Sequence, residues 1–385
     1  PENKNIILPN KNDKKLKVYK DNRWIFKDKE DVINTLVSNN YGLLDNHFEQ
    51  AKMLGLSNID EYVKMNYIKF RKYYTEGDDE LLEIKNDASF RKYYRLLNRD
   101  LIIMDADPKK GESVINFKKI NKILKFLGFS VPEIISVDEE NGFMLIEDFG
   151  NKVFTKILNV ENEKDLLKRA VKVLSEINKK VSENKSIIKN IEKYSIEVLL
   201  QESNLFILWY MQRHMKVEID DASIKDFAKI LENIFEKILP LENTLVLRDY
   251  HVDNLFYLNE RNYVQSVGII DFQDALCGST SYDLISILED VRRPISSELK
   301  KEIINYYIEE AAENREQIFL ETEFFSIQRN LKILGIFCRL NYRDKKHHYL
   351  SMLPRSLEFI QKHIKKEPYS ELNKWMSSFN MVSKT

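Results

Sequence analysis

The chain has 385 residues, which is more than one hydrophobic core usually serves, so we expect two or three packing units. Its 60 Lys and Arg residues nearly balance its 61 Asp and Glu residues, and this argues against nucleic acid as the main partner. The two cysteines lack CxxC spacing, which excludes a zinc ribbon or a disulfide scaffold and favours buried thiols in a reducing compartment.

Residues 1–80 carry aromatic and charged residues in stretches with a helical pattern, such as DNHFEQAKMLGL and IDEYVKMNYIKFRKYY. We expect a mostly helical N-terminal appendage of unknown role. The chain begins with Pro1 instead of Met, which suggests a trimmed sequence with a segment missing upstream. The start has no signal-peptide character and no apolar run approaches 18 residues, so we expect a cytoplasmic protein without a membrane partner.

Residues 81–150 show short β-type runs around one amphipathic helix. LLEI and SFRKYYRLL are followed by a polar NRD turn and by LIIMD, which is the pattern of β-hairpins. In INFKKINKILKFLGF the apolar residues lie on one helical face, and Gly128 is placed to end the helix. EIISV, the turn DEENG and FMLIEDFG then complete the order strand, strand, helix, strand, strand.

From residue 151 to residue 385 helices dominate. DLLKRAVKVLSEIN and SIKDFAKILENIFEKIL have apolar residues at spacings of three and four. The exception is a β-rich island at residues 244–271, which has the pattern of a polar hairpin. The expected fold class is therefore α+β, with a small β-rich lobe at residues 81–150 and a larger helical lobe that carries this hairpin.

The hairpin carries the strongest chemical signal. VLRDYHVDNLFYL places Asp249 and Asn254 between two strand-forming runs, and the chain returns along the hairpin to Asp271. Asn254 and Asp271 should be neighbours, and their hard oxygen atoms suit Mg²⁺. Asp249 is placed to accept a proton from an attacking hydroxyl, so base, metal ligand and metal ligand follow in the order of the protein-kinase catalytic loop. Alternatively, Asp249 caps the loop and Asp271 forms a turn.

Residues 249–254 and 271, with SYDLISILED, resemble the aminoglycoside phosphotransferase superfamily of kinase-like enzymes. NDASFRKYYRL, IIMDADP and GIIDFQDALCGSTSYDLISILEDVRR extend the resemblance over residues 85–375, toward the anomeric sugar kinases of bacterial cell-wall recycling. This implies a bilobal protein-kinase-like fold, with ATP and Mg²⁺ as cofactors and the 1-hydroxyl of N-acetylmuramate or N-acetylglucosamine as acceptor. That family usually has His two residues before the catalytic Asp, where this chain has Leu247, so support for the loop is weakened.

The segment expected to bind the phosphates of ATP differs from that of ordinary kinases. No glycine lies between Gly77 and Gly111, which excludes a Walker loop or a kinase glycine-rich loop in the first hairpin. The phosphates must be held otherwise, and DASFRKYYR offers the Ser89 hydroxyl, turn amides around Ser89 and Phe90, and several cations.

A kinase-type lysine is also missing from the third strand, where LIIMDAD has Met104 and Asp105. We expect Arg91 or Arg95 to supply that positive charge. The alternative is that both arginines face solvent from an ordinary strand.

Two further segments are expected to complete the nucleotide site and the loop. The backbone near Glu147 and Phe149, in FMLIEDFG, should read the adenine edge, unless the segment is an ordinary edge strand that enters a helix. Asp283, at a helix start in SYDL, should hydrogen-bond the catalytic loop, and Arg248 should support the loop next to the base.

The sugar pocket is the least specified part of the site, and its candidates are Tyr282, Arg292, Arg329, Asn330 and Arg339. The lactyl carboxylate of N-acetylmuramate favours Arg or Lys, whereas a cationic acceptor needs acidic residues. An aminoglycoside or choline-type acceptor and a non-catalytic ATP-binding protein remain open as alternatives. We expect a structural role for His251, and a solvated loop instead of a metal site at His347 and His348.

Overall fold

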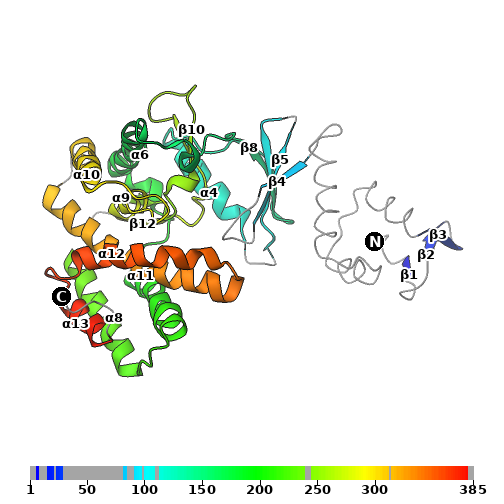
Figure 1. The fold of residues 1–385 in the computed structure, drawn as a ribbon. Helices are drawn as coiled ribbons and strands as arrows, with labels where there is room; N and C mark the ends of the chain where they lie inside the picture. The colour runs from blue at the N-terminus through cyan, green and yellow to red at the C-terminus, as the bar shows by residue number, and fades with distance from the viewer. Residues whose placement is uncertain are drawn as a thin grey trace. The chain divides into compact units, whose positions relative to one another are not determined.

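The computed structural model describes residues 6–7, 15–20, 23–28 and 81–84, and residues 91–379 apart from 98, 109–111, 239–243 and 312–313. The chain divides into two compact units, whose elements are labelled in Figure 1. The first unit comprises residues 1–84 and 93–104, and the second comprises residues 85–92 and 105–385. The expected domain boundaries at residues 80 and 150 stay a prediction.

The first unit begins with a three-stranded antiparallel sheet of β1 (Ile6–Ile7), β2 (Lys15–Lys20) and β3 (Arg23–Asp28). In the antiparallel pairing of β2 with β3, Lys15 is opposite Asp28 and Lys20 is opposite Arg23. Residues 15–20 and 23–28 are strands within the appendage that the sequence predicts to be mostly helical, and they contain residues that favour strands, such as Val18, Tyr19 and Trp24. The mostly helical character of residues 1–80 as a whole stays a prediction. The two stretches with a helical pattern, residues 45–56 and 59–74, lie outside the described residues.

The expected strands after residue 80 are present. β4 (Leu81–Ile84) pairs antiparallel with β5 (Lys92–Leu96), and β6 (Leu101–Asp105) follows the NRD turn. In the second unit β7 (Ile134–Asp138) and β8 (Phe143–Glu147) form an antiparallel hairpin with a register shift near Ile134.

Helix α4 (Val114–Phe126) begins and ends as its sequence predicts. The Ser113 hydroxyl accepts hydrogen bonds from the amides of Ile115 and Asn116, which caps the helix start. Its apolar face, including Phe117 and Leu124, is buried, and Gly128 ends the helix with φ of +83°.

The helical part of the second unit is organised around α11 (Arg315–Asp344). This helix packs against α7 (Ile196–Leu205), the π-helix η4 (Phe206–His214), α9 (Ser281–Leu288) and α12 (Leu353–His363) (Figure 1). Gly335 allows its close contact with α7, because a Cβ atom there would lie 2.3 Å from the carbonyl carbon of Leu205. The other helices are α5 (Phe154–Ile157), α6 (Glu163–Glu183), η3 (Lys185–Ile188), α8 (Asp221–Ile238), η5 (Val252–Asn254), α10 (Ser297–Ala311), η6 (His347–Met352) and α13 (Ser370–Ser378).

Two short antiparallel pairs form the β-rich island. β9 (Thr244–Val246) pairs with β12 (Leu276–Gly278), and β10 (Leu255–Tyr257) pairs with β11 (Val267–Ile269). Leu255 is opposite Ile269, so Asn254 and Asp271 lie at the same end of the β10–β11 hairpin, as the sequence predicts.

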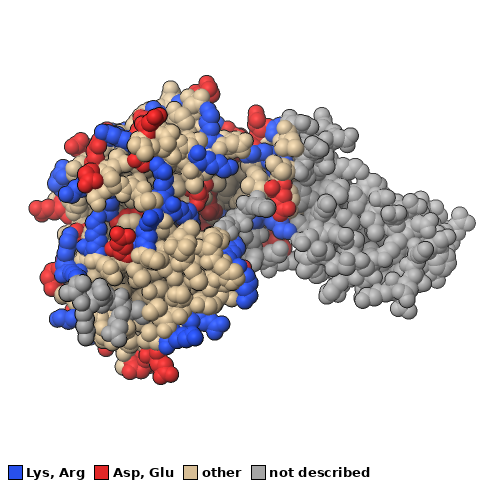
Figure 2. Space-filling model, viewed as in Figure 1, with Lys and Arg blue, Asp and Glu red and all other residues tan. Residues whose placement is uncertain are grey.

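The surface of the second unit has mixed charge. Figure 2 shows Lys and Arg side chains interspersed with Asp and Glu across its visible face, without a continuous field of one sign. The mixed charge on this face agrees with the near-neutral composition of the chain. In the described part of the chain, no helix combines the length and apolar character needed to cross a membrane.

Candidate active site

The loop from Leu247 to Asn254 connects β9 to β10 and is clamped by a buried carboxylate. Asp283, on the first turn of α9 and fully buried, accepts hydrogen bonds from the amides of Leu247 (2.6 Å) and Arg248 (2.9 Å). Burial raises the pKa of Asp283 to about 7, against the opposing effect of these two amides. The hydrogen bonds that the sequence predicts from Asp283 to the loop are therefore present.

The Asn254 side chain links the backbone of Asp249 to the carboxylate of Asp271 where this loop faces the end of β11. Asn254 donates from Nδ2 to the backbone oxygen of Asp249 (2.9 Å) and to Oδ2 of Asp271 (3.4 Å). Because Nδ2 makes these contacts, the amide oxygen of Asn254 points away from them. Asp249 is half-buried and Asp271 retains 40% of its side-chain surface, so both carboxylates remain accessible to a ligand.

The electrostatics of this cluster suit a cation. Desolvation by the surrounding protein and the charge of Asp249 raise the pKa of Asp271 to about 6, while Gln273 and Arg91 act in the opposite direction. Among the described residues, no group of three or more His, Cys, Asp or Glu side chains is arranged to hold a metal. Asn254 and Asp271 therefore fit an ion such as Mg²⁺ only if a ligand supplies further oxygen atoms, which is the usual situation for Mg²⁺ beside phosphates.

Arg91, one of the two arginines predicted to replace the kinase lysine, contacts this cluster. It is 6% exposed, and its guanidinium contacts Oε2 of Glu112 at 2.8 Å and Oδ1 of Asp271 at 3.5 Å. The alternative of a solvent-facing arginine is wrong for Arg91. Sequence reasoning missed Glu112, although an acidic residue just before α4 was a usable signal, since kinases pair their strand lysine with a glutamate of the equivalent helix.

The other residues predicted to contact phosphate are Ser89, Phe90 and Arg95. Ser89 and Phe90 lie outside the described residues. Arg95 lies in β5, in the first unit, opposite Leu82, and its contact with nucleotide stays a prediction.

Arg248 is held by a buried ionic network that sequence reasoning did not find. Glu202 of α7 is 8% exposed, and its Oε1 accepts hydrogen bonds from Arg248 and from Nζ of Lys332 (2.7 Å). The hydroxyl of Tyr194 donates to its Oε2 at 2.7 Å. Burial acts to raise the pKa of Glu202, but the charges of Lys332 and Arg248 outweigh it and hold the pKa at about 2.

Two of the five predicted sugar contacts are corrected by the structure. Tyr282 is 1% exposed in the core, edge-on to Tyr194 and Phe325, and its hydroxyl accepts a hydrogen bond from Lys332. Asn330 is fully buried on α11. Both are sealed from solvent by packing, so neither can touch a sugar in this structure.

The three predicted arginines each have other partners or are at least partly buried. Arg292 pairs with Asp253 (3.0 Å) and Asp290 (3.1 Å), so its charge is already neutralised. Arg329 is 6% exposed and lies over the Tyr282 ring. Burial and the charge of Arg343 lower the pKa of Arg339. Contact of these arginines with substrate stays a prediction.

The segment after β8 packs against the hairpin that ends near Asp271. The Phe149 ring would lie 2.8 Å from a Cβ atom at Gly268 and is 5.7 Å from the Phe256 ring, between centroids. The amide of Glu147 already donates to the Glu133 carbonyl, so the Glu147 backbone can offer adenine only its carbonyl oxygen. Adenine recognition here stays a prediction.

The remaining sequence expectations concern histidines and cysteines. His251 accepts a hydrogen bond from Nδ2 of Asn254 at 3.3 Å, which fits a structural role. His347 and His348 are exposed to solvent as expected, but they begin the 3-10 helix η6 and do not lie in a loop. Cys277 and Cys338 are free and buried, as predicted.

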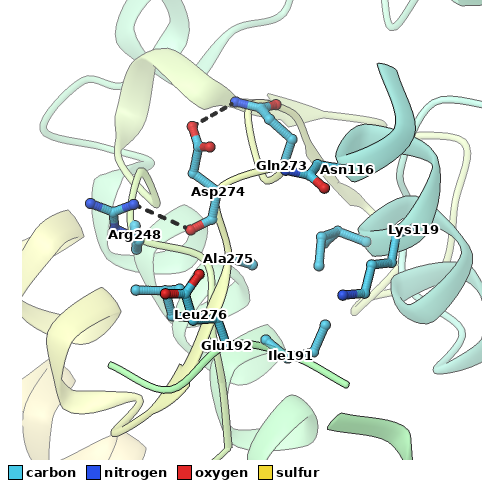
Figure 3. A pocket seen from close by; sticks show the side chains of 10 residues that line it. Asn116, Lys119, Ile191, Glu192, Arg248, Gln273, Asp274, Ala275 and Leu276 are labelled. Carbon is cyan, nitrogen blue, oxygen red and sulfur yellow. Dashed lines mark hydrogen bonds between the residues drawn. The ribbon is translucent and has the colours of Figure 1, made fainter. Parts of the chain in front are cut away.

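A cavity of about 180 Å³ opens beside the loop (Figure 3). Its wall includes Arg248 and the segment from Gln273 to Leu276, which follows Asp271 in the chain. Lys119 and Asn116 of α4 face these residues across the space. None of the five predicted sugar contacts lines this cavity.

The Glu202 network predicts a specific acid dependence of stability. The pKa of Glu202 is lowered from 4.5 to about 2 in the folded protein, so its contribution is fully present above pH 4.5 and is lost as the pH falls toward 2. The shift corresponds to roughly 3 kcal/mol. Urea unfolding at pH 3 to 6 should show that Glu202→Gln is less stable than the wild type and loses part of the acid slope. A variant with an unchanged slope would contradict this assignment.

Comparison with known proteins agrees with this geometry. Residues 80–318 match the model of the phosphotransferase enzyme family. The N-acetylmuramate/N-acetylglucosamine kinase of Pseudomonas aeruginosa is 30% identical over 309 residues, which cover 78% of this chain and 88% of that protein. The enzyme of the same name from Neisseria meningitidis is 31% identical over 303 residues, covering 75% and 87%.

The fold is also similar to that of solved phosphotransferases. The ternary complex of APH(2")-IIa with streptomycin and ATP superposes with a TM-score of 0.53 at 16% identity, covering 79% of this chain and 99% of that one. The expected class, α+β and kinase-like, is therefore confirmed. On the match over residues 80–318 and the two relatives together, the chain belongs to the phosphotransferase enzyme family.

Proposed function

We propose that this protein transfers the γ-phosphoryl group of ATP to the 1-hydroxyl of N-acetylmuramate or N-acetylglucosamine. The observation that supports the proposal is that the Asn254 side chain contacts both the Asp249 backbone oxygen and the Asp271 carboxylate at one end of the β10–β11 hairpin. The names of the relatives support the acceptor, and the ATP in the complex of APH(2")-IIa supports the donor.

Asp249 acts as the base in this mechanism. It orients the sugar hydroxyl and accepts its proton as the oxygen bonds to the γ-phosphorus and the bond to the β-phosphate oxygen breaks, so that ADP leaves. Mg²⁺ bound by Asn254 and Asp271 would neutralise charge on the phosphates. Asp283 and the Glu202 network keep the loop in place, so most of the rate enhancement comes from positioning and charge neutralisation.

Arg91 supplies the cation that ordinary kinases carry on the third strand. Glu112 holds its guanidinium at 2.8 Å, and the other end of the fork faces Asp271. A guanidinium fixed in this way is suited to bidentate contact with phosphate oxygens.

The acceptor is tested by a coupled assay of ADP release. N-acetylmuramate, N-acetylglucosamine, an aminoglycoside and choline are each supplied with ATP and Mg²⁺, and ³¹P NMR identifies the product. We expect a sugar 1-phosphate from one or both amino sugars. Turnover of only the aminoglycoside or choline would replace the proposed acceptor, and binding of ATP without turnover of any acceptor would support a non-catalytic protein.

The base is tested by Asp249→Asn. Loss of a general base should lower kcat by about a hundredfold to ten-thousandfold, while the Kd for ATP stays close to that of the wild type. Asp253→Asn is the matched control, because Asp253 lies in the same loop and pairs with Arg292. Equal losses in the two variants would remove Asp249 from its proposed role.

The role of Arg91 is tested by Arg91→Met and Glu112→Gln. Arg91→Met should raise the KM for ATP by at least about tenfold, because a charge-assisted contact is worth about 1.5–3 kcal/mol. Glu112→Gln should give a smaller effect in the same direction. Arg293→Met, which breaks the ion pair with Glu163 elsewhere in the unit, is the control. An unchanged KM for ATP in Arg91→Met would contradict the assignment.

A further inference from the structure

We propose that Asp290 is a positioning residue of the active site, which holds the His251 ring in the tautomer that orients the Asn254 amide. The Asp290 carboxylate accepts the hydrogen bond of His251 Nδ1–H, directly or through one bound water, and this leaves Nε2 of His251 to accept from Asn254. The inference rests on the proposed function and deepens it, because Asn254 is a proposed metal ligand. All three residues belong to the second unit.

The tautomer of His251 follows from the contacts of the Asn254 amide. Nδ2 of Asn254 lies 2.9 Å from the backbone oxygen of Asp249, and because a backbone oxygen can only accept, the amide nitrogen must be the atom on this side. The same nitrogen lies 3.3 Å from Nε2 of His251. An amide nitrogen can only donate, so Nε2 must accept. The ring hydrogen of His251 therefore lies on Nδ1.

Nδ1 of His251 and Oδ2 of Asp290 are a donor and an acceptor that lack other hydrogen bonds. His251 as a whole is half-buried, but its Nδ1 atom is buried and has no hydrogen-bond partner among the described residues. The Asp290 side chain is 1% exposed, and its Oδ1 accepts from the amide (3.0 Å) and from Nη1 (3.1 Å) of Arg292. Its Oδ2 is buried without a hydrogen bond to the described part of the chain. Because unsatisfied buried polar atoms are unfavourable, joining this donor to this acceptor stabilises both.

Arg292 places the Asp290 carboxylate beside the catalytic loop. Its Nη1 contacts Asp290, while its Nε lies 3.0 Å from Oδ2 of Asp253, two residues after His251 in the chain. Electrostatics agree with this placement, since burial and the charge of Arg292 lower the pKa of His251 and the charge of Asp290 acts in the opposite direction. An effect of Asp290 on the ring requires the two side chains to lie close together.

The tautomer matters because the two ends of the Asn254 amide differ in chemistry. While Nε2 of His251 accepts, the amide nitrogen of Asn254 is held toward the loop and its oxygen is left for the proposed metal. A hydrogen on Nε2 would bring two donors face to face, and the amide would have to turn its nitrogen toward the metal. Asp290 thus acts through His251 and Asn254 and touches neither substrate nor metal. A buried Asp controls a histidine tautomer in the same way in serine protease triads.

NMR of protein labelled with ¹⁵N at histidine tests the tautomer without nucleotide or metal. The chain has six histidines, and His251→Gln identifies the signals of His251. We expect hydrogen on Nδ1 alone in the wild type. In Asp290→Asn the oxygen of the new amide should stay on Arg292 and its NH₂ group should face Nδ1, so the hydrogen should move to Nε2. Hydrogen on Nε2 in the wild type, or hydrogen that stays on Nδ1 in Asp290→Asn, would overturn the inference.

The Mg²⁺ dependence of amino-sugar turnover tests the consequence at the metal. Asp290→Asn should raise the Mg²⁺ concentration for half-maximal turnover by roughly tenfold to a hundredfold, because it removes the support of a ligand. Asp253→Asn is the matched control, since it makes the same substitution in the other carboxylate that pairs with Arg292. The Mg²⁺ requirement of this control should stay within about twofold of the wild-type value. Equal increases in the two variants would assign the effect to Arg292 and contradict the role of Asp290.

A double-variant cycle separates this role from a general loss of packing. In His251→Gln the side-chain amide oxygen can take the place of Nε2 as acceptor, and Asp290 no longer controls it. Adding Asp290→Asn to this variant should therefore change the Mg²⁺ requirement little, whereas effects that multiply would show independent action and overturn the inference. If the wild type phosphorylates no amino sugar, the proposed function fails, while the NMR experiment still decides whether Asp290 controls His251.

Discussion

The arrangement of the site depends on the pair of hydrogen bonds from the amides of Leu247 and Arg248 to the Asp283 carboxylate. They join the start of α9 to a loop that has little regular structure of its own. With its first two residues held in this way, the loop turns the Asp249 carbonyl toward the Asn254 amide. The relative position of the proposed base and metal ligand thus follows from a carboxylate that touches neither substrate nor metal.

A second buried acid extends this support into the helical core. Glu202 takes hydrogen bonds from Arg248, Lys332 and Tyr194, which come from three different segments. Burying these charges costs several kcal/mol per ion, and the cost is offset only when the partners are complete. Removing one partner leaves an uncompensated charge, so the loop, α7 and α11 are energetically coupled through Glu202.

The sequence predicted the features that depend on local spacing. Asp249, Asn254 and Asp271 could be predicted because a hairpin of known pattern joins them. Asp283 could be predicted because it lies at the start of a helix. The Glu202 network could not be predicted, because Lys332 lies 130 residues from Glu202 in the chain and no local pattern links these two residues. The predictions of sugar contacts at Tyr282 and Asn330 were wrong for a related reason. A charged or aromatic residue on a helix indicates chemistry only if its face is known, and Tyr282 and Asn330 lie on buried faces.

Backbone strain gives an independent indication of where these constraints act. Among the described residues other than glycine, those with positive φ are Lys216, Arg248, Asp271 and Lys345. Lys345 is the left-handed C-cap of α11, and Lys216 follows the end of η4, so both have an ordinary helix-terminating role.

Arg248 (φ +71°) and Asp271 (φ +59°) end no helix. Arg248 precedes the proposed base Asp249, and Asp271 is a proposed metal ligand. Such a conformation costs about 1–3 kcal/mol and persists only where surrounding contacts determine it. Asp283 and Glu202 hold Arg248, while Gln273 and Arg91 hold Asp271. The geometry of the site is therefore imposed on the backbone by side chains from distant segments, which is why it could not be read from local sequence preference alone.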